Sequence, residues 1–194
     1  MIIFYQIPED DSRAVRLREI LSEEGLEHRY VGKEQAGLSI GALFAGDTTE
    51  KAHQAADLPE DPGIIFNAAD ISHDDAAKFL DKLVDNGIVF GYQVLADESM
   101  MELPLGDVLI GHRDYQQFLA KLAFLQQMID GCAALQETRY DPDKWSALKI
   151  AIANGNDFLD AVVSDTDSQF DQIDPKDIDR HIADLQNAMR NLLG

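Results

Sequence analysis

The chain has 194 residues, enough to bury one large core or two small ones, and its 45% hydrophobic and 27% charged residues are typical of a folded globular protein. A net charge of −20 repels phosphate backbones and anionic lipid surfaces, so we expect neither nucleic acid nor membrane as a partner. The longest apolar runs span a few residues and the N-terminus lacks the basic start of a secretory signal, so we expect a cytoplasmic protein.

Two segments of the chain, 62 residues apart, repeat one pattern of apolar residues and glycines. The matching positions are Ile2-Ile3-Phe4 with Ile64-Ile65-Phe66, Ala14 with Ala76, Leu17 with Phe79, Leu21 with Leu83, Gly25 with Gly87 and Tyr30 with Tyr92. Each copy has the pattern of a strand, an amphipathic helix, a glycine stop and a second strand, at 2–7, 11–24 and 27–31 and again at 63–68, 73–86 and 89–96. The sequence therefore predicts an α+β protein that begins with a duplicated βαβ domain, a ferredoxin-like or related α/β sandwich. The two repeated strands should be central neighbours, with both helices on one sheet face.

The ends of the two repeated helices carry the expected capping residues. Asp10 and Ser72 precede the helices, where a short polar side chain can accept from the free first-turn N–H groups. Ser72 is followed three residues later by Asp75, which resembles a capping box. Gly25 and Gly87 stand where a left-handed residue ends a helix.

Residues 35–45 between the copies have the apolar content of a short helix, and residues 46–62 are typical of a surface loop. Gly37 and Gly41 are four residues apart, which lets this helix approach a neighbour closely. The same segment places Ser39 in the letters G-x-S-x-G. Because that serine falls inside the predicted helix and not in a strand–turn–helix elbow, we do not expect it to be a nucleophile.

A linker is predicted at residues 97–106, and it divides an α/β domain (residues 1–105) from a helical domain (residues 106–194). Four large apolar side chains in this linker are expected to be exposed and to supply a contact surface for a partner: Met100, Met101, Leu103 and Leu105.

Three amphipathic helices are predicted after Gly111, and short connections should pack them antiparallel. The second and third open at Asp141-Pro142 and Asp174-Pro175, a cap residue followed by proline at the first helical position. The apolar stripes are Tyr115, Phe118, Leu122, Leu125, Ile129 and Cys132; then Trp145, Leu148, Ile152, Leu159 and Val162; then Ile178, Ile182, Leu185, Met189 and Leu192.

The third stripe is a narrow seam that could pack on the first two helices or against a second copy of the chain, so a homodimer is one expectation and a protein partner another. Cys132 is the single cysteine, which excludes an intramolecular disulfide. Its place on the first stripe predicts a buried thiol with a structural role.

Some short segments carry a resemblance to a known family. These are Ile2-Ile3-Phe4-Tyr5 with Ile7-Pro8-Glu9, then Ile40-Gly41-Ala42-Leu43, and Ile64-Ile65-Phe66 leading to Asn86-Gly87-Ile88. On these segments the N-terminal half of the chain resembles a bacterial family of small uncharacterised α/β domains. The resemblance implies a fold and no activity, because none is established for that family.

No residue pattern in the chain predicts a catalytic, cofactor or metal site. The histidines are too far apart along the chain for a helical zinc pair: His28, His53, His73, His112 and His181. His73 is expected to lie on the surface. Asp165-Thr166-Asp167 begins like a calcium loop, but Phe170 stands where the turn needs glycine and Lys176 where a glutamate ligand belongs.

The absence of such patterns favours a non-catalytic regulatory or protein-interaction (adaptor) protein. One alternative is a small-molecule-binding domain that uses the sheet face or the groove between the repeats. Another is an enzyme whose site is assembled from scattered carboxylates and histidines.

Overall fold

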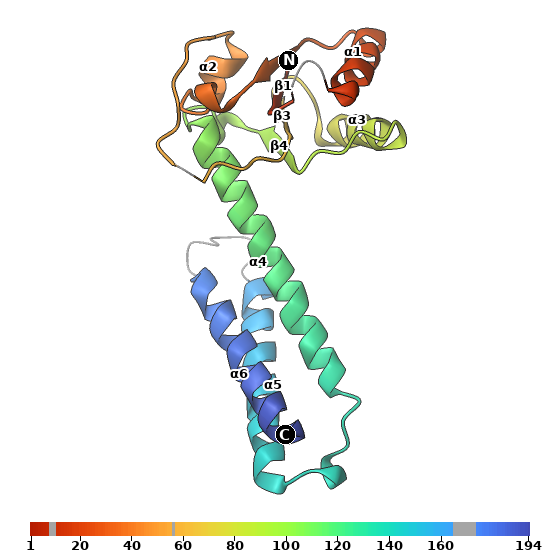
Figure 1. The fold of residues 1–194 in the computed structure, drawn as a ribbon, viewed down its shortest axis with the longest axis vertical. Helices are drawn as coiled ribbons and strands as arrows, with labels where there is room; N and C mark the ends of the chain where they lie inside the picture. Colours follow the sequence, from red (N-terminus) through yellow and green to blue (C-terminus); the bar gives the residue numbers. More distant parts are fainter. Residues whose placement is uncertain (8–10, 56, 165–173) are drawn as a thin grey trace. The chain divides into compact units, whose positions relative to one another are not determined.

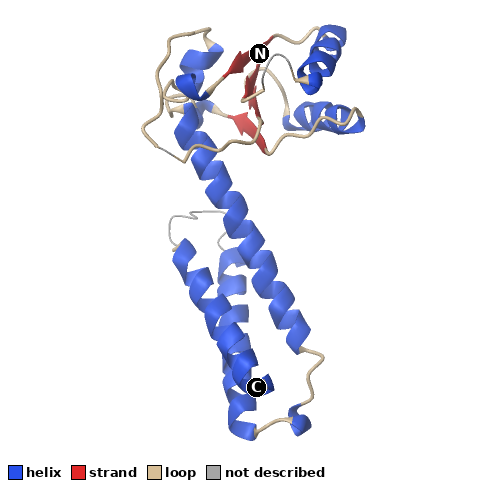
Figure 2. Cartoon of the chain, in the orientation of Figure 1, coloured by secondary structure: helices blue, strands red, loops and turns tan. Residues whose placement is uncertain are grey.

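A computed structural model of the chain describes residues 1–7, 11–55, 57–164 and 174–194. The fold is α+β, with a small mixed sheet and its helices followed by a helical region (Figures 1 and 2). The chain forms two compact units, Met1–Asp114 and Tyr115–Gly194. The boundary between them falls within one helix, α4 (Leu105–Cys132), and not in a loop.

The sheet of the first unit contains two βαβ units side by side. Its four strands, in the order β2-β1-β3-β4, are β1 (Ile2–Tyr5), β2 (His28–Val31), β3 (Gly63–Asn67) and β4 (Tyr92–Ala96). β1 is parallel to β2, β3 is parallel to β4, and the central pair β1 and β3 is antiparallel. The prediction that Ile2–Phe4 and Ile64–Phe66 are central neighbours is therefore confirmed.

The ferredoxin-like alternative is not the arrangement of this sheet. A ferredoxin-like sheet splits each βαβ unit, so that a strand of one unit lies between the two strands of the other. Here Ile2 pairs directly with His28 and Ile64 directly with Gln93, so each unit keeps its own strands adjacent.

The repeat spacing of 62 residues does not extend into the second strand of each unit. Equivalent pairs are Ile2 with His28 and Ile64 with Gln93, so positions 28 and 93 correspond, 65 residues apart. Three additional residues after Gly87 cause this shift. The predicted match of Tyr30 with Tyr92 is wrong, because Tyr30 pairs with Phe4 whereas Tyr92 pairs with Gly63, and the two rings pack in different cores.

Helices α1 (Ser12–Glu24) and α3 (His73–Asp85) cover one face of the sheet, as predicted. Both contribute to one core with the strands, which includes Phe4, Leu17, Leu21, Phe66, Phe79 and Leu83. α1 begins one residue later than expected, with Asp11 accepting from the N–H of Arg13 at 2.8 Å; the predicted cap Asp10 lies outside the described residues. α3 is capped as predicted, with Ser72 Oγ accepting from the N–H of Asp75. Gly25 and Gly87 have positive φ angles of 64° and 74°, as predicted for the two helix ends.

The opposite face of the sheet is covered by a second core, built from η1 (Lys33–Gln35), α2 (Ile40–Phe44) and the first turns of α4. The helix predicted at 35–45 begins only at Ile40, because Ser39 caps it by accepting from the N–H of Ala42. Gly41 does allow a close approach: a Cβ there would lie 3.1 Å from the carbonyl oxygen of Met101. The neighbour is an irregular segment and not a helix.

The segment predicted as an exposed linker is part of this second core. Leu105 is fully buried and Met100 and Met101 pack against the core, while Leu103 is 45% exposed. The backbone is held on both sides, since Ile40 N–H donates to Leu103 O and Leu105 N–H donates to Leu38 O. The predicted exposure is therefore wrong for Leu105, holds for Leu103, and applies only in part to Met100 and Met101. The reason is that α4 starts at Leu105, before Gly111, and its first turns face the sheet.

The second unit is a closed helical core made by the later turns of α4 with α5 (Pro142–Ser164) and α6 (Pro175–Leu193); a short turn, η3 (Glu137–Arg139), follows α4. The caps Asp141 and Asp174 accept backbone N–H bonds as predicted. The core takes residues from all three predicted stripes, among them Leu125, Leu148, Ile178, Leu185 and Leu192. The α6 seam thus packs within its own unit, which is the first of the two arrangements expected for it.

Cys132 provides a test of this helical core. Its side chain is 3% exposed, and burial raises the pKa of its thiol. Because the thiolate is the reactive form, we expect the native protein to react with a thiol reagent such as DTNB at least a hundred times more slowly than the protein in guanidinium chloride. The chain has one cysteine, so the absorbance reports this position alone. Native labelling at the denatured rate would contradict the packing of α4 against α5 and α6.

Candidate functional site

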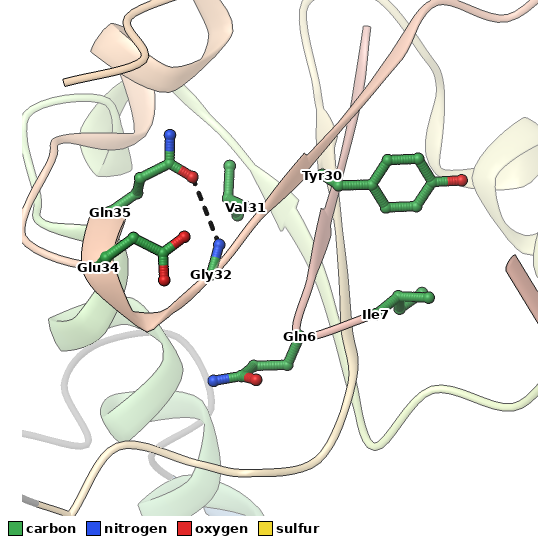
Figure 3. Close-up of a pocket in the computed structure, with 7 residues that line it drawn as sticks. All are labelled: Gln6, Ile7, Tyr30, Val31, Gly32, Glu34 and Gln35. Carbon is green, nitrogen blue, oxygen red and sulfur yellow. Dashed lines mark hydrogen bonds between the residues drawn. The ribbon is translucent and has the colours of Figure 1, made fainter. Parts of the chain in front are cut away.

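The first unit has an open pocket of about 310 Å³ where β1 and β2 end (Figure 3). It is lined by Gln6, Ile7, Tyr30, Val31, Gly32, Glu34 and Gln35. Because the two strands are parallel, their carboxyl ends meet at the same edge of the sheet, and this is the edge where ligands commonly bind in open α/β sheets. The sequence analysis identified none of the polar residues of this pocket as site residues.

Gln6 has an unusual backbone at this edge. Its φ of 59° makes it the one non-glycine residue with positive φ in the part of the chain that the structure describes. Its N–H donates to Val31 O at 3.0 Å, which holds the turn directly onto the end of β2. A left-handed glutamine costs roughly 1–3 kcal/mol of backbone strain, and such strained residues cluster at functional sites.

The polar wall of the pocket is built by the turn that follows β2. Gln35 Oε1 accepts from the N–H of Gly32 at 3.4 Å, which orients the half-buried amide, while the Glu34 carboxylate is exposed. Figure 3 shows Gln6, Glu34 and Gln35 on one side of the two strands, with Ile7 and Tyr30 directed to the other. Among the described residues that line the pocket there is no lysine or arginine, and the neighbouring Lys33 is paired with Glu60 at 3.2 Å.

The equivalent turn of the second βαβ unit provides a comparison inside the same chain. There Gln6 and Ile7 are replaced by Ala68 and Ala69, and the Asn67 side chain accepts from the N–H of Ala69 at 3.1 Å. This turn is closed by its own local hydrogen bonds. The left-handed Gln6 and the polar side chains of Glu34 and Gln35 belong to the first βαβ unit.

A second polar cluster joins the loop before β3 to the start of α4. His53 Nε2 donates to Asp107 Oδ1 at 2.9 Å, and His53 Nδ1 accepts from the N–H of Ala55 at 3.1 Å. Both ring nitrogens are therefore occupied, so neither is available as a base or a metal ligand. His53 and Asp107 border a cavity of about 380 Å³, but their role in this structure is to hold the loop to the helix.

The other histidines do not combine into a site. His73 is exposed as predicted, His112 packs against Tyr92, and His181 packs against Phe158. In the described part of the chain, no three His, Cys, Asp or Glu side chains come together in a group that could hold a metal ion. The sequence Asp165-Thr166-Asp167 lies outside the described residues.

Comparisons with known proteins add no relative. No protein-family model, curated protein or solved structure matches the chain. Within the described residues, no helix combines the length and the apolar character that crossing a membrane requires.

The His53 contact can be tested through two glycines of α4. A Cβ at Gly106 would lie 2.5 Å from the Cγ of His53, whereas a Cβ at Gly111 meets nothing within 4 Å. Gly106→Ala should therefore lower the free energy of unfolding by about 1–3 kcal/mol, because the imidazole ring must move away from Asp107. Gly111→Ala should raise it by up to about 1 kcal/mol, because alanine favours the helix. Urea unfolding measures both, and equal shifts for the two variants would contradict the contact.

His112 predicts a pH dependence of stability. Its burial against Tyr92 lowers its pKa below the ordinary value of 6.5, so the unfolded chain binds the proton more tightly than the folded chain. The stability from the neutral ring is complete above pH 6.5 and falls as the pH drops through the folded pKa. Denaturant unfolding between pH 5 and 8 should show a smaller loss on the acid side in His112→Gln than in the parent. His73→Gln, which removes an exposed histidine, is the matched control for the substitution itself.

Proposed function

We propose that the first unit is a non-catalytic binding module for a small amine-bearing molecule, held at the carboxyl ends of β1 and β2. The observation that carries the proposal is the strained Gln6 beside a pocket whose polar groups are two amides and a carboxylate. The strain is otherwise unexplained, because glycine would form the same turn without cost.

The chemistry of the pocket selects the ligand. The amide oxygens of Gln6 and Gln35 and the carboxylate of Glu34, which lie on one side of the two strands, can accept hydrogen bonds from an ammonium group. A net charge of −20 concentrates cations at the surface and repels anions. A ligand with a phosphate or carboxylate would meet Glu34 with no positive side chain in the lining to balance it.

Three observations support this pocket over the other sites and functions considered. Both faces of the sheet are covered by side-chain cores, so a ligand site on the sheet face has no room. Of the apolar side chains expected to form an adaptor surface, Leu105 is buried and Met100 and Met101 are partly buried against the second core. The described lining residues include no nucleophile with an adjacent base, which favours recognition over catalysis.

A matched set of four-carbon probes tests the proposal: putrescine, 1,4-butanediol and succinate in 150 mM salt. We expect saturable changes in the amide resonances of Gln6, Gly32 and Gln35 with putrescine, weaker changes with the diol and none with succinate. In Gln6→Gly, binding should weaken at least tenfold while the unfolding midpoint rises, because glycine relieves the positive φ.

Two charge variants separate the pocket from the general acidity of the surface. Glu34→Gln should weaken putrescine binding, and Glu98→Gln, which removes the same charge after β4, should not. Resonance changes spread over the acidic surface and equal in both variants would refute the proposed site.

A further inference from the structure

The outer edge of β4 is open for pairing with another strand. Tyr92 N–H donates to Pro62 O, and Ala96 O accepts from Ala68 N–H, so the backbone groups of Tyr92 and Ala96 face β3. In a parallel ladder the alternate residues face the other way. The N–H and C=O groups of Gln93 and Leu95 therefore point outward, and β4 is the last strand of the sheet.

The two edges of the sheet differ in their protection. The β2 edge carries Arg29, whose guanidinium donates to Leu43 O at 2.6 Å and ties that edge to α2. The β4 edge reads Tyr-Gln-Val-Leu-Ala and has no charged residue and no proline. Proteins commonly protect exposed edges with such residues, so an unprotected edge is a site for strand addition.

An apolar groove lies directly beside this open edge, between β4 and α3. Its volume is about 160 Å³, and its lining residues are Phe66, His73, Ala76, Ala77, Leu80, Gln93, Val94 and Leu95. That volume suits one aliphatic side chain at a time. Two of the exposed large apolar residues of the first unit, Val84 and Val89, lie at the end of α3 and in its connection to β4.

The charges around the groove indicate a basic occupant. Asp74 and Asp81 precede and follow Ala77 by three and four residues, so they share its side of α3, and both are exposed. The lysines of α3 are engaged elsewhere, since Lys78 pairs with Asp75 and Lys82 pairs with Glu23 and Glu24. Asp97 and Glu98 add negative charge where β4 ends.

We propose that β4 accepts an extended peptide segment of another protein as a fifth strand, with apolar side chains at alternate positions and lysine or arginine at its flanks. The backbone of Gln93 and Leu95 supplies the hydrogen bonds, and the groove beside Ala77 and Leu80 takes one apolar side chain. A second copy of this chain fits the same edge less well. Pairing β4 with itself would bring two acidic surfaces together.

The test uses the full chain and a capped heptapeptide, acetyl-Lys-Val-Thr-Val-Thr-Val-Lys-amide. We expect the peptide to shift the amide resonances of Gln93 and Leu95 and to slow their hydrogen exchange at least tenfold. A peptide with glutamate in place of both lysines should bind at least tenfold more weakly. The pocket lies at the carboxyl ends of β1 and β2, away from β4, so putrescine should leave the amides of Gln93 and Leu95 unchanged.

Two variants block the edge by different means. Gln93→Pro removes an outward N–H that β3 does not use, and Gln93→Thr is its control because threonine keeps that N–H. Ala77→Lys fills the groove from the helix and adds a repelling charge, with Ser22→Lys on α1 as the control for added charge. Both blocking variants should lose peptide binding at least tenfold, and both controls should retain it.

Other outcomes of the same experiments would contradict the proposal. Binding that survives Ala77→Lys, or peptide-induced protection at amides away from β4, would overturn the proposal. Protection of Gln93 and Leu95 that grows with protein concentration in the absence of peptide would show instead that a second copy occupies the edge.

Discussion

The antiparallel pairing of β1 with β3 is the interaction on which the first unit depends. Ile2 pairs with Phe66, Ile3 with Ile65 and Phe4 with Ile64, and these side chains are almost completely buried on both faces of the sheet. At about 1.5–3 kcal/mol for each fully buried side chain, these two strands contribute a large share of the hydrophobic free energy. Because each strand also begins a βαβ unit, this pairing joins the two units into one sheet and places α1 and α3 on the same face.

The antiparallel contact also decides where a ligand can bind. It places the carboxyl ends of β1 and β2 at one end of the strands and the carboxyl ends of β3 and β4 at the opposite end. The two βαβ units thus have their carboxyl strand ends at opposite ends of the sheet. At the first, Gln6 adopts a strained turn beside an open pocket; at the second, small alanines and the Asn67 side chain close the turn.

The apolar pattern predicts the parts of this protein that depend on local sequence. The runs Ile2–Phe4 and Ile64–Phe66, the glycines at 25 and 87 and the Asp-Pro helix starts all mark their elements, because capping and burial act over a few residues. Strand register is different. It depends on the three additional residues after Gly87, and no local pattern shows that Tyr92 pairs with Gly63.

Residue type alone also fails to separate an exposed apolar segment from a buried one. Met100 and Leu105 resemble a linker in sequence, yet α2 and the sheet bring a surface to them from residues far away in the chain. The pocket residues are missed for a related reason. Gln6, Glu34 and Gln35 are common surface types, and they gain significance only when β1 and β2 are parallel neighbours. The signal that could have found them is the βαβ pattern itself, since it predicts that the turns at 6–7 and 32–35 meet at one edge.

The two proposed binding surfaces follow from a single difference between the two βαβ units, which have the same topology. In the first βαβ unit the outer strand β2 carries a charged residue, Arg29, that ties it to α2, and the pocket lies at the carboxyl end of this strand. In the second βαβ unit the turn after the inner strand β3 is closed by Asn67, while the outer strand β4 has an open backbone edge along its length. The first βαβ unit is therefore suited to a compact molecule and the second to an extended chain. Since β1 and β3 separate the two outer strands, binding at one surface requires no movement of the other.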